Sequence, residues 1–240
     1  MIEFLQRHRR TPVFALILLV SSALAAAEPV LKERVNALSS SAAPSIDGAP
    51  IAAVRAIKAL YEQRGWQPVW TDPAMIHTLY DEVLRSSEHG LSPDDFHARQ
   101  LAAVLQSDRT DPVTLAKTEI LCTDAFARLA VTLHFGKLDP EGLDPVWNLS
   151  RAIDGRNVVS TINHALSSGD PSTVLAAAPP DLPVYNQLRS ALARYRGIMA
   201  RGGWPVVPDG KGMKLGSTGP RVEILRLRLI ATGDLTAPEP

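Results

Sequence analysis

Apolar residues recur at helical spacing along most of the chain. Between 51 and 65, Val54, Ile57, Leu60 and Tyr61 fall at positions i, i+3, i+6 and i+7, on one face of a helix. The same spacing, bounded by Pro or Asp at the start and Gly at the end, recurs in other stretches. These stretches are 73–89, 111–136, 184–201 and 220–232, with shorter ones at 156–168 and 171–178. The pattern predicts an all-α fold, a compact multi-helix domain with loops rich in Pro, Gly and Trp.

One junction between two of these helices has the composition of an active site. The segment SSEHGLSPDDFH, residues 86–97, contains a His-Gly pair, two adjacent acids and a second histidine. Each residue also suits a helix junction. Gly90 fits a left-handed C-terminal cap, and Leu91 fits the hydrophobic position after it. Ser92 and Pro93 fit a helix start, with Asp95 completing a capping box. The segment therefore predicts a helix end joined to a helix start.

Composition agrees with packed helices and identifies the N-terminus as a separate segment. Hydrophobic residues make up 45% of the 240 residues and aromatic residues only 5%, a balance that favours helices over a β-sandwich. Residues 1–27 combine a basic start, an apolar run at 13–27 and A-x-A cleavage sequences. This predicts a signal peptide and an exported, periplasmic protein. The alternative is an uncleaved membrane anchor, against which the apolar run is shorter than the roughly 20 residues that span a bilayer.

Charge excludes nucleic acid as the expected partner. Three arginines and one glutamate lie in residues 1–27, so the mature chain has a net charge of about −2, compared with 0 for the whole chain. A protein that neutralises phosphates needs a surplus of Lys and Arg, and an exported protein rarely meets DNA. No nucleic-acid binding is predicted, and no stable membrane span is expected after signal cleavage.

The side chains that could perform catalysis lie in unfavourable positions. Cys122 falls in the middle of a helix on its apolar stripe, where a thiol is buried and unactivated. Asp94 and Asp95 are adjacent on a helix and so point about 100° apart. The acids in KLDPEGLDP (Asp139, Glu141 and Asp144) have the spacing of turn formers. We therefore predict no catalytic residue.

Metal and cofactor sites are not predicted either. The histidines after the signal peptide form neither HxH nor HExxH; they are His77, His89, His97, His134 and His164. The Gly-rich segment PDGKGMKLGSTG, residues 208–219, does not match a phosphate-binding loop. The four tryptophans (Trp66, Trp70, Trp147 and Trp204) are the candidates for stacking against a sugar or peptide ligand. For Trp66 and Trp70, which flank Pro68, packing into the core is the alternative.

The chain divides into four parts on these grounds. Residues 1–27 are the predicted signal peptide, and the Ser/Ala/Pro-rich residues 28–49 are a predicted linker with a short helix. The helical domain covers 50–208. Residues 209–240 hold a Gly-rich connector and one last amphipathic helix, which cannot bury its apolar face alone.

Five stretches together resemble a known family. In chain order they are ALYEQRGWQPVW, SSEHGLSPDDFH, LHFGKLDPEGLDPVW, YNQLRSALARYRGIMARGGWPVVPDG and GSTGPRVEILRLRLIATGDL. They resemble the N-terminal scaffold region of the large bacterial L,D-transpeptidases that remodel peptidoglycan. The resemblance covers roughly residues 50–235. It implies a helical scaffold whose last helix starts a peptidoglycan-binding module, followed by a mainly β catalytic domain.

That catalytic domain supplies a Cys nucleophile in a Ser/Thr-His-Gly-Cys motif, which this sequence does not contain. Leu91 follows His89 and Gly90, and Cys122 lies in ILCTDAF. The resemblance therefore implies the scaffold portion of a transpeptidase, truncated before the catalytic domain and inactive alone. Its expected partner is peptidoglycan or a separate transpeptidase catalytic domain. The alternative is a stand-alone exported protein that binds the cell wall or docks on a transpeptidase.

Overall fold

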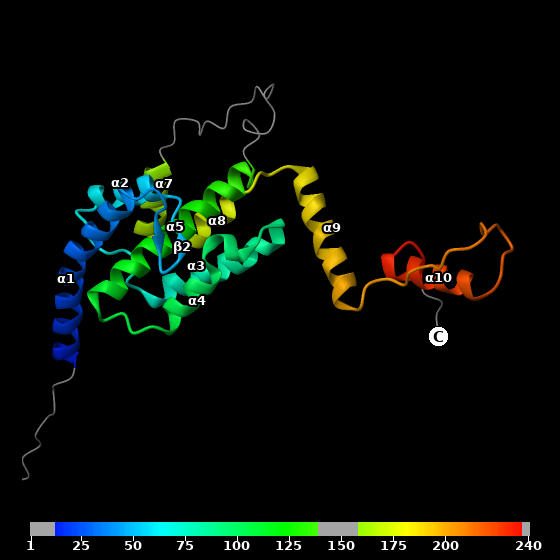
Figure 1. The fold of residues 1–240 in the computed structure, drawn as a ribbon, viewed down its shortest axis with the longest axis horizontal. Coiled ribbons are helices and arrows are strands. Elements are labelled where there is room, and N and C mark those ends of the chain that lie inside the picture. The colour runs from blue at the N-terminus through cyan, green and yellow to red at the C-terminus, as the bar shows by residue number, and fades with distance from the viewer. Residues whose placement is uncertain (1–12, 139–157, 237–240) are drawn as a thin grey trace, which may run out of the picture. The chain divides into compact units, whose positions relative to one another are not determined.

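The computed structural model describes residues 13–138 and 158–236, and these residues form an all-α fold with one short hairpin (Figure 1). The helices and strands of the first 138 residues are α1 Val13–Ser39, β1 Ser45–Ile46, β2 Ala49–Pro50, α2 Val54–Gln63, α3 Pro73–Arg85, the 3₁₀ turns η1 Ser86–His89 and η2 Pro93–Phe96, α4 Ala98–Gln106 and α5 Pro112–Phe135. Those that follow are α7 Val158–Ser168, α8 Pro171–Ala177, α9 Pro183–Ala200 and α10 Pro220–Thr232. The helical periodicity thus predicted the fold class correctly.

The chain forms two compact units, 1–180 and 181–240. The second unit begins just before α9, whereas the sequence grouped that helix with the preceding ones in a domain ending at 208. The helix itself was expected, but spacing along the chain does not reveal which neighbours a helix packs against.

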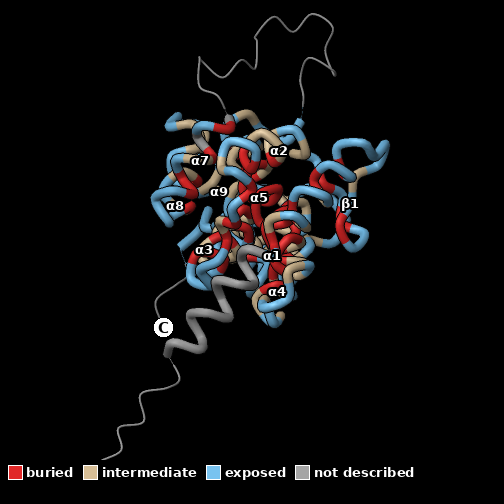
Figure 2. The backbone as a smooth tube through the Cα atoms, turned by 90° about the vertical axis from the view of Figure 1, so that its left-hand side faces the viewer, coloured by how far each residue is buried: buried red, intermediate tan, exposed pale blue. Residues whose placement is uncertain are grey.

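Helix α5 is the centre of the first unit, and buried residues follow its whole length (Figure 2). Asp111 accepts a hydrogen bond from the Thr114 amide at 2.8 Å and so caps the start, where Pro112 takes the first helical position. Gly136, at φ 85°, ends the helix. Among the described residues, α5 contacts the helices α1, α2, α3, α4, α7 and α8 and the turn η2. Because neighbours pack on several sides of α5, 14 of its 24 residues are buried, which explains its mostly apolar sequence.

Residues 28–49 are part of this helical unit, so their interpretation as a linker was wrong. Helix α1 runs through to Ser39 and packs against α5. Leu31, Val35 and Leu38, at i, i+4 and i+7, are all buried in the core. Next, β1 and β2 pair antiparallel and bury Ile46 and Ala49. The composition of this segment, rich in Ser, Ala and Pro, gave no indication that these five apolar residues are buried.

The signal peptide stays a prediction. Helix α1 begins at Val13, within the predicted segment, and Ala27 is buried. Residues 1–12 lie outside the described part of the chain. Among the described residues, no helix is long and apolar enough to cross a membrane.

The junction at 86–97 agrees with the sequence at its first half and differs at its second. Gly90 is left-handed (φ 77°), and the Leu91 amide donates to the Ser86 carbonyl at 3.3 Å, which ends α3 and η1 as expected. The Ser92 side chain makes no capping hydrogen bond, so the predicted capping box is wrong. The Asp95 amide donates to the Ser92 carbonyl at 3.0 Å, and the Asp95 side chain binds the Lys137 ammonium at 2.7 Å. Here η2 is a single turn, and α4 begins only after His97, a left-handed residue at φ 63°.

The second unit is held by arginines that bind the loop between α9 and α10. Arg221 donates to the carbonyls of Pro208 (2.9 Å) and Lys211 (2.7 Å). The Arg228 guanidinium lies 5.5 Å from the centre of the Trp204 ring, whose edge packs against Tyr195 at 5.9 Å. These contacts attach the loop to both helices of the unit.

Candidate functional site

Three polar side chains in the middle of α5 are completely enclosed, namely Glu119, Thr123 and Asp124. None of their atoms is accessible to solvent. Buried polar groups are costly unless they are hydrogen-bonded. Each of these groups has partners in a segment outside α5, and the partners define two hydrogen-bond networks.

The first network fixes the loop that follows α2. The Glu119 carboxylate accepts hydrogen bonds from the backbone amides of Val69 and Trp70, both at 2.8 Å, and from the Tyr61 hydroxyl at 2.6 Å. Thr123 lies 3.0 Å from both the Tyr61 hydroxyl and the Trp70 indole nitrogen. The network therefore holds an irregular segment against the centre of the core.

Burial dominates the ionisation of this network. It raises the pKa of Glu119 from its ordinary 4.5 to about 7, although the hydrogen bonds from Tyr61, Val69 and Trp70 oppose the shift. Burial and the nearby Glu119 carboxylate both raise the pKa of Tyr61. The phenol therefore stays protonated and available to donate.

The second network centres on Asp124. Its Oδ1 accepts from the amides of Ala52 (2.9 Å) and Ala53 (2.6 Å), and its Oδ2 lies 2.7 Å from Nε2 of His97. A carboxylate only accepts, so the His97 nitrogen that faces it carries the hydrogen. The Arg128 Nη1 atom is the most distant partner, at 3.4 Å from Oδ2. One side chain thus connects the start of α2, the left-handed residue before α4 and a guanidinium on α5.

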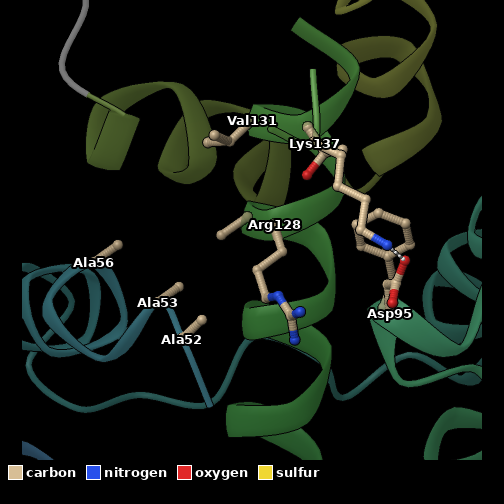
Figure 3. Close-up of a pocket in the computed structure, with 10 residues that line it drawn as sticks. Ala52, Ala53, Ala56, Asp95, Arg128, Val131 and Lys137 are labelled. Carbon is tan, nitrogen blue, oxygen red and sulfur yellow. Dashed lines mark hydrogen bonds and ion pairs between the residues drawn. The ribbon is translucent and has the colours of Figure 1, made fainter. Parts of the chain in front are cut away.

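A pocket of about 430 Å³ opens beside this second network (Figure 3). Its walls come from three elements: the start of α2, η2 and the last turns of α5. Small and apolar side chains line most of it, and Arg128, Lys137 and Asp95 add charge. The lining residues are Ala52, Ala53, Ala56, Asp95, Phe96, Ala127, Arg128, Val131, Thr132 and Lys137. Pockets of this size, with few charged groups, are typical of small-ligand sites.

A family model described as "Scaffold domain" matches residues 55–192, more than half of the chain. The chain belongs to the Scaffold domain family. No curated protein and no solved structure matches it significantly. The Scaffold domain match includes Glu119, Asp124 and His97. It begins just after Ala52 and Ala53, which form the pocket wall at the start of α2.

The four tryptophans of this Scaffold domain protein lie in different surroundings. Trp70 is fully enclosed and packs near Phe126, with 6.3 Å between ring centres, and Trp66 is 9% exposed. Both pack in the core, the alternative that the sequence left open. Trp204 is 38% exposed and sits in the second unit, and Trp147 lies outside the described residues. Ligand stacking by these side chains stays a prediction.

The remaining sequence candidates are not brought together. Cys122 is fully buried, and burial raises the pKa of its thiol, so it lacks the accessible thiolate of a nucleophile. Asp94 pairs with Arg99 at 3.3 Å, whereas Asp95 pairs with Lys137. The acids at 139–144 lie outside the described part of the chain. Within that described part, no three His, Cys, Asp or Glu side chains converge to hold a metal ion.

Sequence reasoning missed the contact between His97 and Asp124. The two residues are 27 positions apart, on different elements, and no local spacing connects them. The one available indication is that Glu119, Thr123 and Asp124 lie among apolar residues in the middle of α5. Polar residues inside a buried helix require partners, and partners imply a network.

Proposed function

We propose that this chain is the scaffold portion of an exported L,D-transpeptidase that remodels peptidoglycan. The observation that carries the proposal is the Scaffold domain match over 55–192. Three of the five stretches that resemble transpeptidase scaffolds lie wholly inside that range, and a fourth begins inside it. Its role is to present a rigid helical body, not to perform the reaction.

The chemistry of the chain supports a non-catalytic role. Acyl transfer through a thioester needs an accessible thiolate and a nearby base. The single cysteine, Cys122, is enclosed in α5, and its environment raises the pKa of the thiol instead of lowering it. The sequence contains no Ser/Thr-His-Gly-Cys motif. In this proposal the nucleophile belongs to a separate or following catalytic domain.

A muropeptide assay tests the non-catalytic role. The purified chain is incubated with isolated peptidoglycan, and the digested products are analysed by mass spectrometry. We expect neither new crosslinks nor amino-acid exchange, and a Cys122→Ala variant should give the same product profile. Turnover that disappears in the Cys122→Ala variant would contradict the proposal.

The link to a transpeptidase is tested at the level of the gene. The DNA that follows codon 240 is expected to encode a His and a Ser/Thr-His-Gly-Cys motif, in frame or after a disruption. An intact, unrelated gene at that place would favour the stand-alone binding protein instead.

Export is tested with the apolar run at 13–27. An Ile17→Arg substitution places a charge in the centre of that run and should retain the chain in the cytoplasm. The wild-type chain should be found in the periplasmic fraction. Equal distribution of the two proteins would exclude a functional signal peptide.

A further inference from the structure

We infer that the pocket beside Asp124 binds the carboxylate end of a short peptide with small side chains, and that Arg128 receives the carboxylate. The inference goes beyond the proposed function, because it assigns a ligand site to the scaffold itself. It rests on the charges, the wall composition and the volume of the pocket.

Arg128 is the group that selects an anion. Its side chain is 27% exposed and lines the pocket (Figure 3). Among the residues that the structure describes, Asp124 is the one carboxylate within ion-pair distance, and only Nη1 approaches it, at 3.4 Å. The oxygens of Asp124 have closer partners in Ala52, Ala53 and His97. Because a guanidinium has five N–H donors, Arg128 keeps donors for a second carboxylate.

Lys137 adds positive charge at the rim of the pocket and leaves the position next to Arg128 open for the ligand carboxylate. It binds Asp95 at 2.7 Å, on the η2 side of the pocket. Figure 3 shows that this pair lies opposite the alanine wall, with Arg128 between them. The three charged side chains that line the pocket sum to +1, but the buried Asp124 carboxylate beside Arg128 offsets that charge. The preference for an anionic ligand therefore rests on the remaining N–H donors of Arg128.

The walls around Arg128 are mostly apolar, and the volume of the pocket sets the size of the ligand. Ala52, Ala53 and Ala56 line one side, Ala127 and Val131 line α5, and Phe96 contributes a larger apolar surface. These methyl-sized and apolar side chains offer a surface against which ligand methyl groups can pack. A volume of about 430 Å³ accommodates a ligand of two or three small residues.

Isothermal titration calorimetry on the full chain tests the inference with N-acetyl-dialanine, in its L,L and D,D forms, as the probe. The matched ligand is the C-terminal amide of the same peptide, which retains the methyl groups and removes the charge. We expect one of the two acids to bind and its amide to bind at least tenfold more weakly. Binding of the L,L form points to a protein C-terminus, and binding of the D,D form points to a cell-wall peptide; either result supports the pocket.

Two variants locate the binding, and one serves as a control. Arg128→Gln should weaken binding at least tenfold. Ala56→Leu narrows the pocket at its alanine wall, away from Arg128, and should weaken binding at least tenfold. Arg55→Gln removes an exposed charge from the same helix and should leave affinity within twofold. Helical circular dichroism confirms that each variant is folded.

Three results would overturn the inference. The first is no heat of binding with either acid, and the second is equal affinity for the acid and its amide. The third is full affinity in the folded Ala56→Leu variant. The muropeptide assay is independent of all three, so the site and the proposed function can fail separately.

Discussion

Glu119 makes the stability of the helical unit depend on pH in a direction that is unusual for a carboxylate. Its pKa is raised to about 7 in the folded chain and is 4.5 ordinarily. Between these values the folded state holds a proton that the unfolded state has lost. The contribution of Glu119 to stability is therefore largest below pH 4.5, falls as the pH rises, and is lost once the pH has passed the folded pKa of about 7.

The size of this pH dependence follows from the shift in the pKa of Glu119. One unit of pKa corresponds to about 1.4 kcal/mol, so a shift from 4.5 to about 7 makes the ionised group cost on the order of 3 kcal/mol. Between pH 5 and pH 8 the expected loss from this residue is about 2 to 3 kcal/mol. The slope within this interval approaches 1.4 kcal/mol per pH unit.

The perturbation is Glu119→Gln, which removes the titration and keeps the shape. The glutamine oxygen can still accept from the Trp70 amide, but its NH₂ group faces the Val69 amide, which also donates. This leaves a buried donor unpaired and costs about 1 to 3 kcal/mol at every pH. The variant is thus less stable than wild type at pH 5.

The assay is urea unfolding, followed by circular dichroism at 222 nm, for wild type and variant from pH 5 to pH 8. The difference in free energy of unfolding between the two proteins cancels the titration of all other groups. We expect that difference to shrink by about 2 to 3 kcal/mol as the pH rises. A difference that stays constant, or that grows with pH, would refute the reasoning, because it would mean that Glu119 is ionised throughout.

Three further predictions concern stability. Asp124→Ala leaves two backbone amides and a histidine without their hydrogen-bond partner, so it should lower the free energy of unfolding in urea by about 3 to 5 kcal/mol. The control is Asp94→Ala at an exposed ion pair, which should change the free energy of unfolding by less than about 0.5 kcal/mol. Leu31→Ala should cost about 2 to 5 kcal/mol because the side chain is fully buried, and an unchanged midpoint would restore the linker interpretation. Gly90→Ala should lower the melting temperature, since position 90 is left-handed, whereas the helical Gly197→Ala should raise it; equal effects would contradict the backbone assignment.

The helices could be predicted because their positions depend on local spacing. Asp111, Pro112 and Gly136 delimit α5 in the sequence within a residue of where the structure places its ends. The C-terminal end of α7 and both ends of α8 were similarly close. Capping and apolar periodicity act within a few residues, so one sequence contains the information that they need.

The errors came from interactions that are distant along the chain. Residues 28–49 have the composition of a linker, but Leu31 and Val35 meet α5 about 85 residues further on. Ser92 has the sequence of a cap, but Lys137 takes the acid that would complete the capping box. In both cases a long-range partner determined the outcome, and local composition says nothing about such partners.

The second buried network fixes the walls of the pocket in place. Asp124 lies beneath the pocket and holds the backbone of Ala52 and Ala53, which form one wall. It also holds His97, the residue after Phe96, which forms another wall. Arg128 follows one helical turn later on α5 and supplies the charge. Because hydrogen bonds to backbone amides fix the main chain itself, a single buried carboxylate sets the distance between walls that come from different parts of the sequence. A scaffold built in this way can keep a binding pocket open without a ligand, since its shape depends on the core rather than on the groups that would contact the ligand.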